Sequence, residues 1–529
     1  MEHTKDYYEE LYPERNLAEG KIVTRFAPSP TGFVHIGSLF TSFISSRFAR
    51  QTNGVMVLRI EDTDQKREVE NGITNIIKDL KTFNIEFDEG ALDEINYKGN
   101  YGPYIQSKRK DIYQAFAKYL IENDKAYPCF MSETELEEIR SKQETVKARI
   151  GIYGEFARFR DISMEEALER INRGEKYIIR FKSPGKFDNR IKVNDAVKGE
   201  IEFPENDMDI VIIKADGLPT YHFAHLVDDH LMHVTHVIRS DEWLSSLPIH
   251  VQLFDAFGYE RPTYAHLSPL MKKENGNIRK ISKRKDPEAA VSFYHEKGIP
   301  VEAVMIYLMT VANSNFEAWT EENQGKHYTE FEMSFDKISS SGALFDMEKL
   351  MNISKNYISK MKAEDLYNEA VKYSEEFDLD FANLLKQYKN YSISVLNIER
   401  EVERPRKDID SFGSVKNEIS YMFDELFNPE YEKKEFYDKE MLTYYIDNVY
   451  EESDTKDIWF AKIKEMCPKY GFASETKEYK TNPEKYKGSV AQVCEVIRVA
   501  VTGRTMTPDL YEILKLLGKE RIKERIEKF

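Results

Sequence analysis

The sequence predicts an α/β protein in which a parallel sheet is split by an α+β insertion and followed by an all-helical C-terminal half. Three observations lead to this prediction. Strand-like runs alternate with amphipathic helices near the N-terminus, a charged stretch interrupts them, and helical spacing dominates beyond about residue 347. Alternating strands and helices are typical of parallel sheets, because parallel strands need helical crossovers. The 529 residues are enough for about three to five domains.

The first strand leads through a glycine turn into a helix. Residues 22–26 run into Pro-Ser-Pro-Thr-Gly, and a helix is predicted to open near Gly37 and to end at Asn53 and Gly54. A helix N-terminus offers unpaired N–H groups and partial positive charge, so it is suited to hold a phosphate. His35, directly before this helix, is able to donate to a phosphate oxygen. The apolar residues at helical spacing are Leu39, Phe40, Phe43, Ile44 and Phe48.

A second strand and helix complete a β-α-β-α beginning. Residues 55–60 are dominated by apolar side chains, which is typical of a strand buried on both faces of a parallel sheet. This strand delivers Glu61, Asp62 and Asp64 to its carboxyl end, where open α/β sheets bind ligands. The following helix is predicted from the spacing of Ile73, Ile76, Ile77, Leu80 and Phe83.

The α/β pattern then breaks and later resumes. From about residue 107 to residue 209 the chain carries long charged helices and short strands, which predicts an insertion within the sheet domain. The strands predicted inside it lie at 177–182 and 200–203. The segments predicted to resume the parallel sheet are strands at 209–217 and 233–240 and a helix at about 246–257.

A compact basic loop, KISKRK at residues 280–285, lies beyond residue 263 in a region that is predicted to be helical. Such a loop is able to neutralise charge that develops on a phosphoryl group in a transition state. The loop is locally basic although the whole chain has a formal net charge of −17. Because contact with phosphates depends on local patches, the acidic total does not exclude a nucleic-acid partner.

The composition excludes several classes of protein. With 41% hydrophobic and 32% charged residues, the chain is predicted to be soluble and globular. The acidic N-terminus lacks the apolar core of a signal peptide, and no stretch approaches the roughly 18 apolar residues of a membrane span. Three cysteines, Cys129, Cys467 and Cys494, are too widely spaced for a disulfide framework. We therefore expect a cytoplasmic protein without membrane association.

Two motifs carry a resemblance to a known family. PSPTGFVHIGS at residues 28–38 and KISKRK resemble the HIGH and KMSKS signatures of class I aminoacyl-tRNA synthetases. RFAPSPTGFVHIG, followed by LRIEDTD at residues 58–64, resembles the glutamyl-tRNA synthetases in particular. The resemblance implies a Rossmann-like catalytic domain. It also implies ATP-dependent ligation of L-glutamate to the 3′-terminal adenosine of tRNA(Glu) through a glutamyl-adenylate, with release of AMP and pyrophosphate.

The resemblance also implies a domain order. An N-terminal extension precedes a catalytic domain in two halves, which are separated by a connective insertion that binds the acceptor end of tRNA. A stem-contact region with the KISKR loop and a helical anticodon-binding region follow. The N-terminal extension is expected at 1–20, the two halves of the catalytic domain at 21–106 and 210–262, and the insertion between them at 107–209. The stem-contact region is expected at 263–355 and the anticodon-binding region at 356–529.

By position, the resemblance implies a pocket for glutamate. Arg25 is expected to bind the side-chain carboxylate, because a planar guanidinium binds a carboxylate bidentately. Glu61 is expected to bind the ammonium group, and Tyr221 and Arg239 to orient the substrate. The implied glutamate-binding residues are Arg25, Ala27, Ser29, Glu61, Tyr221 and Arg239.

The resemblance likewise implies an ATP site and a catalytic group. His35 and Gly37 are expected to serve ATP, and Glu242 to meet the ribose or adenine region. Lys283, with Lys280 in support, is expected to stabilise the pyrophosphate leaving group. Mg²⁺ is implied by the ATP chemistry and not by a ligand motif in the sequence.

Departures from the family pattern limit other expectations. Ser38 stands at the fourth HIGH position, and His225 stands where some members carry an amide or an apolar residue. Only Cys129 lies near the insertion, where some members bind zinc, so no zinc site is expected. The resemblance favours a monomer. It leaves open whether tRNA(Gln) is charged as well as tRNA(Glu).

A histidine-rich stretch at residues 221–236 offers a second interpretation. Five of the eleven histidines, together with Asp228 and Asp229, fall within it, and such residues are metal ligands elsewhere. The alternation of apolar and polar residues instead predicts a strand, a loop and a strand, which would scatter the rings over two faces. The stretch also resembles the floor of the family's active site. We therefore expect no metal site here.

Three other functions remain open at this point. Glutaminyl-tRNA synthetase is the nearest, although its signatures usually differ from FAPSPTG and IEDTD. A truncated paralogue that glutamylates a tRNA base is disfavoured by the long helical C-terminal half. A catalytically inactive relative that only binds tRNA is disfavoured by the presence of His35, Gly37, Glu61 and Lys283.

Overall fold

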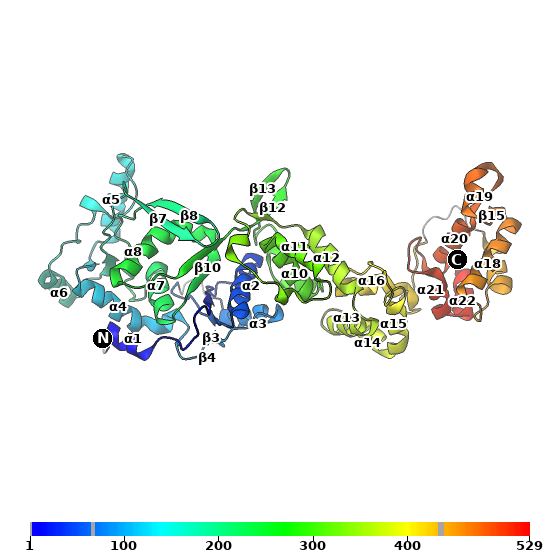
Figure 1. The fold of residues 1–529 in the computed structure, drawn as a ribbon, viewed down its shortest axis with the longest axis horizontal. Helices are drawn as coiled ribbons and strands as arrows, with labels where there is room; N and C mark the ends of the chain where they lie inside the picture. Colours follow the sequence, from blue (N-terminus) through cyan, green and yellow to red (C-terminus); the bar gives the residue numbers. More distant parts are fainter. Residues whose placement is uncertain (1–2, 65–68, 432–437) are drawn as a thin grey trace. The chain divides into compact units, whose positions relative to one another are not determined.

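The computed structural model describes residues 3–64, 69–431 and 438–529, which form two compact units (Figure 1). Unit 1 comprises Met1–Phe293 and Met305–Asp346. Unit 2 comprises Tyr294–Val304 and Met347–Phe529. The predicted fold class is confirmed, because unit 1 contains a parallel sheet flanked by helices and unit 2 is built almost wholly from helices.

A parallel sheet forms the centre of unit 1. Strand β1 pairs with β2 and β2 with β3, all in parallel, and β4 closes that edge in antiparallel orientation. On the other side β10, itself parallel to β11, lies beside β1, where Thr235 N–H donates to the Val23 carbonyl oxygen at 3.0 Å. The order is therefore β3-β2-β1-β10-β11, and it reverses between β1 and β10. The strands are β1 (Val23–Phe26), β2 (Val55–Leu58), β3 (Glu89–Ala91), β4 (Tyr97–Lys98), β10 (His236–Ser240) and β11 (Thr263–Leu267).

Helices cover this sheet as the sequence predicts. Helix α2 begins at Ile36 and ends at Gln51, and its five predicted apolar residues are all buried. Figure 1 shows α2 against β10, so segments about 200 residues apart in the chain meet at the centre of unit 1. The other helices in this part of unit 1 are α1 (Lys5–Leu11), which packs on α4, and α3 (Gly72–Thr82), α4 (Lys110–Glu122), α7 (Tyr221–Leu231) and α8 (Leu247–Phe257).

The insertion carries its own antiparallel sheet. The sequence predicted that residues 209–217 resume the parallel sheet, and this is wrong, since β9 pairs with β6 in the order β5-β6-β9. An apolar run predicts a buried strand but not its partner, which is chosen by tertiary packing. A separate hairpin, β7–β8, reaches β11. The elements are β5 (Ala126–Cys129), α5 (Glu133–Thr145), α6 (Met164–Asn172), β6 (Ile178–Phe181), β7 (Arg190–Asp195), β8 (Gly199–Pro204) and β9 (Val211–Ile213).

The region beyond residue 263 was predicted to be helical, and this is wrong at its start, where the chain forms strands. Strand β12 (Leu270–Glu274) forms a hairpin with β13 (Asn277–Lys280), and the KISKR loop follows directly from β13. Asn275 and Gly276 both have positive φ, and such a pair is typical of a two-residue hairpin turn. Helices resume beyond the loop with α9 (Ser292–Glu296), α10 (Val301–Ala312) and α11 (Asn315–Glu322), and β14 (Ala343–Leu344) pairs with β12.

The described residues of unit 2 are helical, as predicted, apart from the two-residue strands β15 (Phe472–Ala473) and β16 (Gly488–Ser489). Its core consists of apolar side chains that its helices bury, among them Leu366, Val493 and Leu514. None of the helices in the described residues is long and apolar enough to cross a membrane. The helices of unit 2 are α12 (Met347–Ser359), α13 (Ala363–Phe377), α14 (Leu379–Gln387), α15 (Lys389–Asn397), α16 (Val415–Ile419), α17 (Lys439–Tyr444), α18 (Lys456–Met466), α19 (Thr476–Thr481), α20 (Val490–Thr502), α21 (Leu510–Leu517) and α22 (Lys519–Lys528).

Candidate active site

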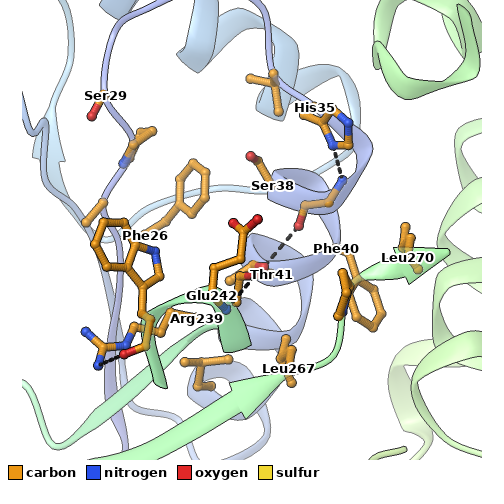
Figure 2. A pocket seen from close by; sticks show the side chains of 18 of the residues that line it. Phe26, Ser29, His35, Ser38, Phe40, Thr41, Arg239, Glu242, Leu267 and Leu270 are labelled. Atoms are coloured by element: carbon orange, nitrogen blue, oxygen red, sulfur yellow. Dashed lines mark hydrogen bonds between the residues drawn. The ribbon is translucent and has the colours of Figure 1, made fainter. Parts of the chain in front are cut away.

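One cavity of about 440 Å³ opens where the strand order reverses between β1 and β10 (Figure 2). Ligands of open α/β sheets bind at such a switch point, beyond the carboxyl ends of the strands. The residues that the sequence singled out all line this cavity, although they come from five separate segments of the chain. They are Arg25, Ala27, Ser29, His35, Gly37, Glu61, Tyr221, Arg239, Glu242, Lys280 and Lys283.

His35 caps the N-terminus of α2 inside the cavity. Its Nδ1 accepts the Gly37 N–H at 2.9 Å, as Figure 2 shows. Burial, together with the nearby charges of Lys283 and Lys280, lowers the pKa of His35 to about 4. The ring is therefore neutral at pH 7 and carries its hydrogen on Nε2, from which it can donate to a ligand. A Cβ on Gly37 would lie 3.2 Å from His35 Nδ1, so glycine leaves this cap undisturbed.

A cluster of buried charges makes up the floor of the cavity: Arg25 and Glu61 line it, and Arg59 and Asp229 lie directly behind them. Arg59 donates to Asp229 at 2.5 Å and to Glu61 at 3.2 Å. Arg25 Nε lies 3.4 Å from the same Asp229 carboxylate. Burial by itself would raise the pKa of Asp229, but Arg59, His225 and Arg25 hold it well below its usual range. The pKa of Glu61 is raised, because its burial outweighs the pull of Arg59 and Arg25.

Sequence reasoning did not assign a role to Arg59 or Asp229. A signal was present for Arg59, since a charged residue within an apolar strand run must find a buried partner. Below this layer Asp228 accepts from Arg109 Nε at 2.7 Å and from Tyr113 Oη at 2.8 Å. These bonds tie α7 to α4 and hold the floor in place.

Arg239 extends from β10 on the opposite side of the cavity from His35 (Figure 2). Its Nε–H donates to His266 Nε2 at 3.0 Å, and one terminal nitrogen donates to the Tyr221 hydroxyl at 2.9 Å. The other terminal nitrogen lies 3.2 Å from His250 Nδ1. Within the described chain, the hydrogen-bonding partners of this 5% exposed guanidinium are all neutral groups. Its positive charge is thus left to attract an anionic ligand.

Residues 221–231 of the histidine-rich stretch fold as helix α7, so the first predicted strand is wrong. The second is confirmed, because strand β10 begins at His236 after a short loop. Phe223, Leu226 and Val227 are spaced three and four apart, and this helical spacing outweighed the short alternation of apolar and polar residues. His225 is fully buried, with Nδ1 2.9 Å from Asp229 and Nε2 3.1 Å from the Tyr264 hydroxyl. No group of three or more potential metal ligands occurs among the residues that the structure describes.

The KISKR loop forms the rim of the cavity. Lys283 Nζ donates to the Phe33 carbonyl oxygen, and Lys280 forms an ion pair with Glu242. Both lysines lie close enough to His35, before the α2 N-terminus, for their charges to lower its pKa, and they are able to meet negative charge there. Asp286 holds the two ends of the loop together. It accepts from both terminal nitrogens of Arg279 and from the Ser282 N–H at 2.8 Å.

Comparison with known proteins identifies the class. A family model described as the catalytic domain of class I tRNA synthetases (E and Q) matches residues 21–352, and an anticodon binding domain model matches residues 380–529. The fold and the cavity thus define a class I aminoacyl-tRNA synthetase of the E and Q group.

Within this class, the chain belongs to the glutamate–tRNA ligase family. It is 48% identical to the glutamate–tRNA ligase of Clostridium perfringens strain SM101, with 100% of this chain and 97% of that protein covered. It is 47% identical, with the same coverage, to that of Clostridium beijerinckii. A crystal structure of a glutamate tRNA ligase from Elizabethkingia meningosepticum, in complex with its amino acid, has a TM-score of 0.78 at 27% identity, over 96% of this chain and 99% of that one.

Proposed function

We propose that the chain attaches L-glutamate to the 3′-terminal adenosine of tRNA(Glu) in two steps. In the first, a glutamate carboxylate oxygen attacks the α-phosphorus of ATP, the bond to the β-phosphate breaks, and pyrophosphate leaves. In the second, a terminal hydroxyl of the tRNA attacks the adenylate and AMP leaves. The supporting observation is a cavity that joins a helix N-terminus, two loop lysines and a buried arginine–carboxylate floor. Incorporation of radiolabelled glutamate into purified tRNA(Glu) tests it.

Two arginines in this cavity can meet the negative charges of glutamate. Arg25 stands on the floor, and we assign it to the side-chain carboxylate. Glu61 is assigned to the substrate ammonium, whose positive charge would favour the ionised form of this buried carboxyl group. Tyr221 and Arg239 orient the substrate, while Ala27 and Ser29 form the wall beside it.

Replacing Arg25 tests the glutamate pocket. Arg25→Ala should cost on the order of 2–5 kcal/mol of glutamate recognition, because a charge in a partly buried site would lose its partner. Arg47→Ala is the matched control, since Arg47 is also buried but donates to the carbonyl oxygens of Thr329 and Phe331. If the KM for glutamate and kcat/KM were unchanged in Arg25→Ala, the assignment would be wrong.

The groups around the α2 N-terminus are suited to ATP. The His35 Nε2–H can donate to a phosphate oxygen, and the partial positive charge at the N-terminus of α2 favours a phosphate beside it. Lys283 can stabilise the leaving pyrophosphate, with Lys280 in support. Glu242 is assigned to the ribose or adenine region, so its ion pair with Lys280 must rearrange when the nucleotide enters.

Mg²⁺ is proposed to enter on the phosphates of ATP. The carboxylates that line the cavity, Glu61 and Glu242, are already paired with Arg59 and Lys280. The described residues therefore offer no ready cage for a metal. Such an arrangement fits Mg²⁺, which is usually held by substrate phosphates and water.

Transfer RNA is proposed to trigger activation. The matched anticodon-binding domain supports tRNA binding by the C-terminal region. Contacts far from the cavity would supply binding energy that orders the reacting groups. We therefore expect negligible exchange between ATP and pyrophosphate with glutamate alone and a steep rise when tRNA(Glu) is added. Rapid exchange without tRNA would contradict this coupling. Absence of exchange in both cases, with tRNA bound, would favour an inactive tRNA-binding relative.

The choice of tRNA substrate, the oligomeric state and the cellular location of the protein are further points of the proposal. A charging assay with purified tRNA(Glu) and tRNA(Gln) decides whether one or both are accepted. We propose a cytoplasmic monomer, which light scattering tests. The curated relatives given above are glutamate–tRNA ligases and are matched over their full length, which disfavours both the glutaminyl and the truncated alternatives.

A further inference from the structure

A buried carboxylate of the insertion reaches toward the glutamate pocket. Asp195 ends strand β7, in the turn of the β7–β8 hairpin, and is 1% exposed. One oxygen accepts the N–H groups of Val197 at 3.0 Å and Lys198 at 2.9 Å. The other lies 2.6 Å from Nδ1 of His266, a residue of β11. The hairpin turn is thereby fastened to the central sheet.

His266 also bonds to Arg239, through the other nitrogen of its ring. Because a guanidinium is protonated at any physiological pH, the Arg239 Nε–H must donate to His266 Nε2, which carries the lone pair. The hydrogen of the neutral ring then lies on Nδ1 and is donated to Asp195. Burial lowers the pKa of His266, so the ring stays neutral despite its carboxylate partner. The tautomer is fixed from both sides.

We propose that Asp195 and His266 are positioning residues of the glutamate site. Asp195 selects the tautomer of His266, and His266 holds the guanidinium of Arg239 in the orientation that faces the cavity. The inference rests on the proposed role of Arg239 in the glutamate pocket. It makes the insertion hairpin a part of the amino-acid site, although no hairpin residue lines the cavity.

A second set of contacts, made by Lys198, fastens the hairpin turn to the sheet. Lys198 Nζ donates to Ser268 Oγ at 2.5 Å and to the Ser340 carbonyl oxygen at 2.7 Å. It also lies 3.4 Å from Asp241, directly after β10. The turn therefore bonds to the ends of both β10 and β11, the two strands that carry Arg239 and His266.

Asp195→Asn tests the proposal with little change in volume. Four donors converge on this side chain: the N–H groups of Val197, Lys198 and His266, and His266 Nδ1. Asparagine offers one oxygen, so its NH₂ group must face one of these donors or drive His266 into the Nε2–H tautomer. That tautomer would point a hydrogen at Arg239. We expect the KM for glutamate to rise about 10- to 100-fold, with the KM for ATP within about twofold.

Asp209→Asn is the matched control. Asp209 is another insertion carboxylate with 1% exposure, and it binds Tyr127, Ser183 and Arg160 but does not contact His266 or Arg239. This variant should lose stability without a selective change in the KM for glutamate. Equal effects of the two substitutions on that KM would overturn the proposal.

A double-mutant cycle separates positioning from general damage. If Asp195 acts through His266, then Asp195→Asn should add no more than about twofold to the KM for glutamate in a His266→Phe background. Full additivity of the two substitutions would overturn the proposal.

A spectroscopic readout does not depend on activity. In protein labelled with ¹⁵N-histidine, the His266 ring, assigned by its absence in His266→Phe, should show the Nδ1–H tautomer and should lose it in Asp195→Asn. An Nε2–H tautomer in the unaltered protein would overturn the relay. If the unaltered protein charged no tRNA but showed the Nδ1–H tautomer, the proposed function would be wrong, whereas the hydrogen bonds from Asp195 through His266 to Arg239 would be confirmed.

Discussion

The floor and the rim of the cavity pair charges of the same kinds in opposite settings. On the floor, the side chains of Arg59 and Asp229 are both 0% exposed. On the rim, Lys280 and Glu242 are 47% and 59% exposed. Removing one partner of a buried pair leaves a charge without solvent, whereas water replaces the partner of an exposed one. The floor is therefore suited to hold a substrate in one place, and the rim to rearrange around it.

The largest expected effect lies on the floor. Asp229→Asn should lower the free energy of unfolding by about 3–5 kcal/mol, because it leaves Arg59 and Arg25 buried with one fewer countercharge. Urea unfolding monitored by circular dichroism measures this. A loss below about 1 kcal/mol would remove the distinction between floor and rim.

The rim should matter for turnover instead. Lys283→Ala should lower kcat by roughly 10²–10³, since a donor aimed at a leaving group acts mainly in the transition state. The unfolding midpoint and the affinity for tRNA should be nearly unchanged, because this lysine is exposed and bonds only to a carbonyl oxygen among the described residues. Lost tRNA affinity with unchanged turnover would make the loop a basic surface turn.

The stability of the floor should depend on pH through His225. Burial and the charges of Arg239 and Arg25 lower the pKa of His225 to about 3, although Asp229 opposes the shift. Above about pH 6.5 the ring is neutral in both the folded and the unfolded chain. As the pH falls from there toward 3, the unfolded chain gains a proton that the folded chain refuses. The free energy of unfolding should then fall by about 1.4 kcal/mol per pH unit from this group.

His225→Asn should make that loss of stability shallower between pH 6.5 and pH 4.5. Urea unfolding of both proteins across this range measures the difference in slope. Identical slopes would mean that His225 accepts its proton in the folded protein, and that the floor is open to water.

The smallest effect is expected at the rim pair. Glu242→Gln should change the free energy of unfolding by no more than about 1 kcal/mol, because exposed ion pairs contribute little. It serves as the control for Asp229→Asn under the same urea conditions. A loss comparable with that of the floor variant would show that exposure does not govern these pairs.

The sequence by itself determined the parts of the site that depend on local structure. The spacing of apolar residues predicted helix α2, and its position placed His35 and Gly37 at the helix N-terminus, where N–H groups point outward whatever surrounds them. The motif resemblance named residues that line the cavity, and several of them belong to local features: Arg25 lies near the end of β1, Tyr221 starts α7 and Lys280 ends β13. Such features follow from neighbouring residues along the chain and need no distant partner.

Only the tertiary structure decided which groups support those residues. The start of the histidine-rich stretch was predicted as a strand but folds as helix α7, because short apolar runs fit more than one element. Strand β9 forms where a strand was predicted, but packing places it in the sheet of the insertion instead of the parallel sheet. The partners of Arg239 come from α7, α8 and β11, and the carboxylate behind His266 comes from the insertion. Burial makes these contacts strong, since buried polar groups must find partners, but burial depends on how distant segments fold together. The charge on Arg239 is therefore visible in the sequence, whereas the neutral rings that leave it free for an anion emerge only in the folded chain.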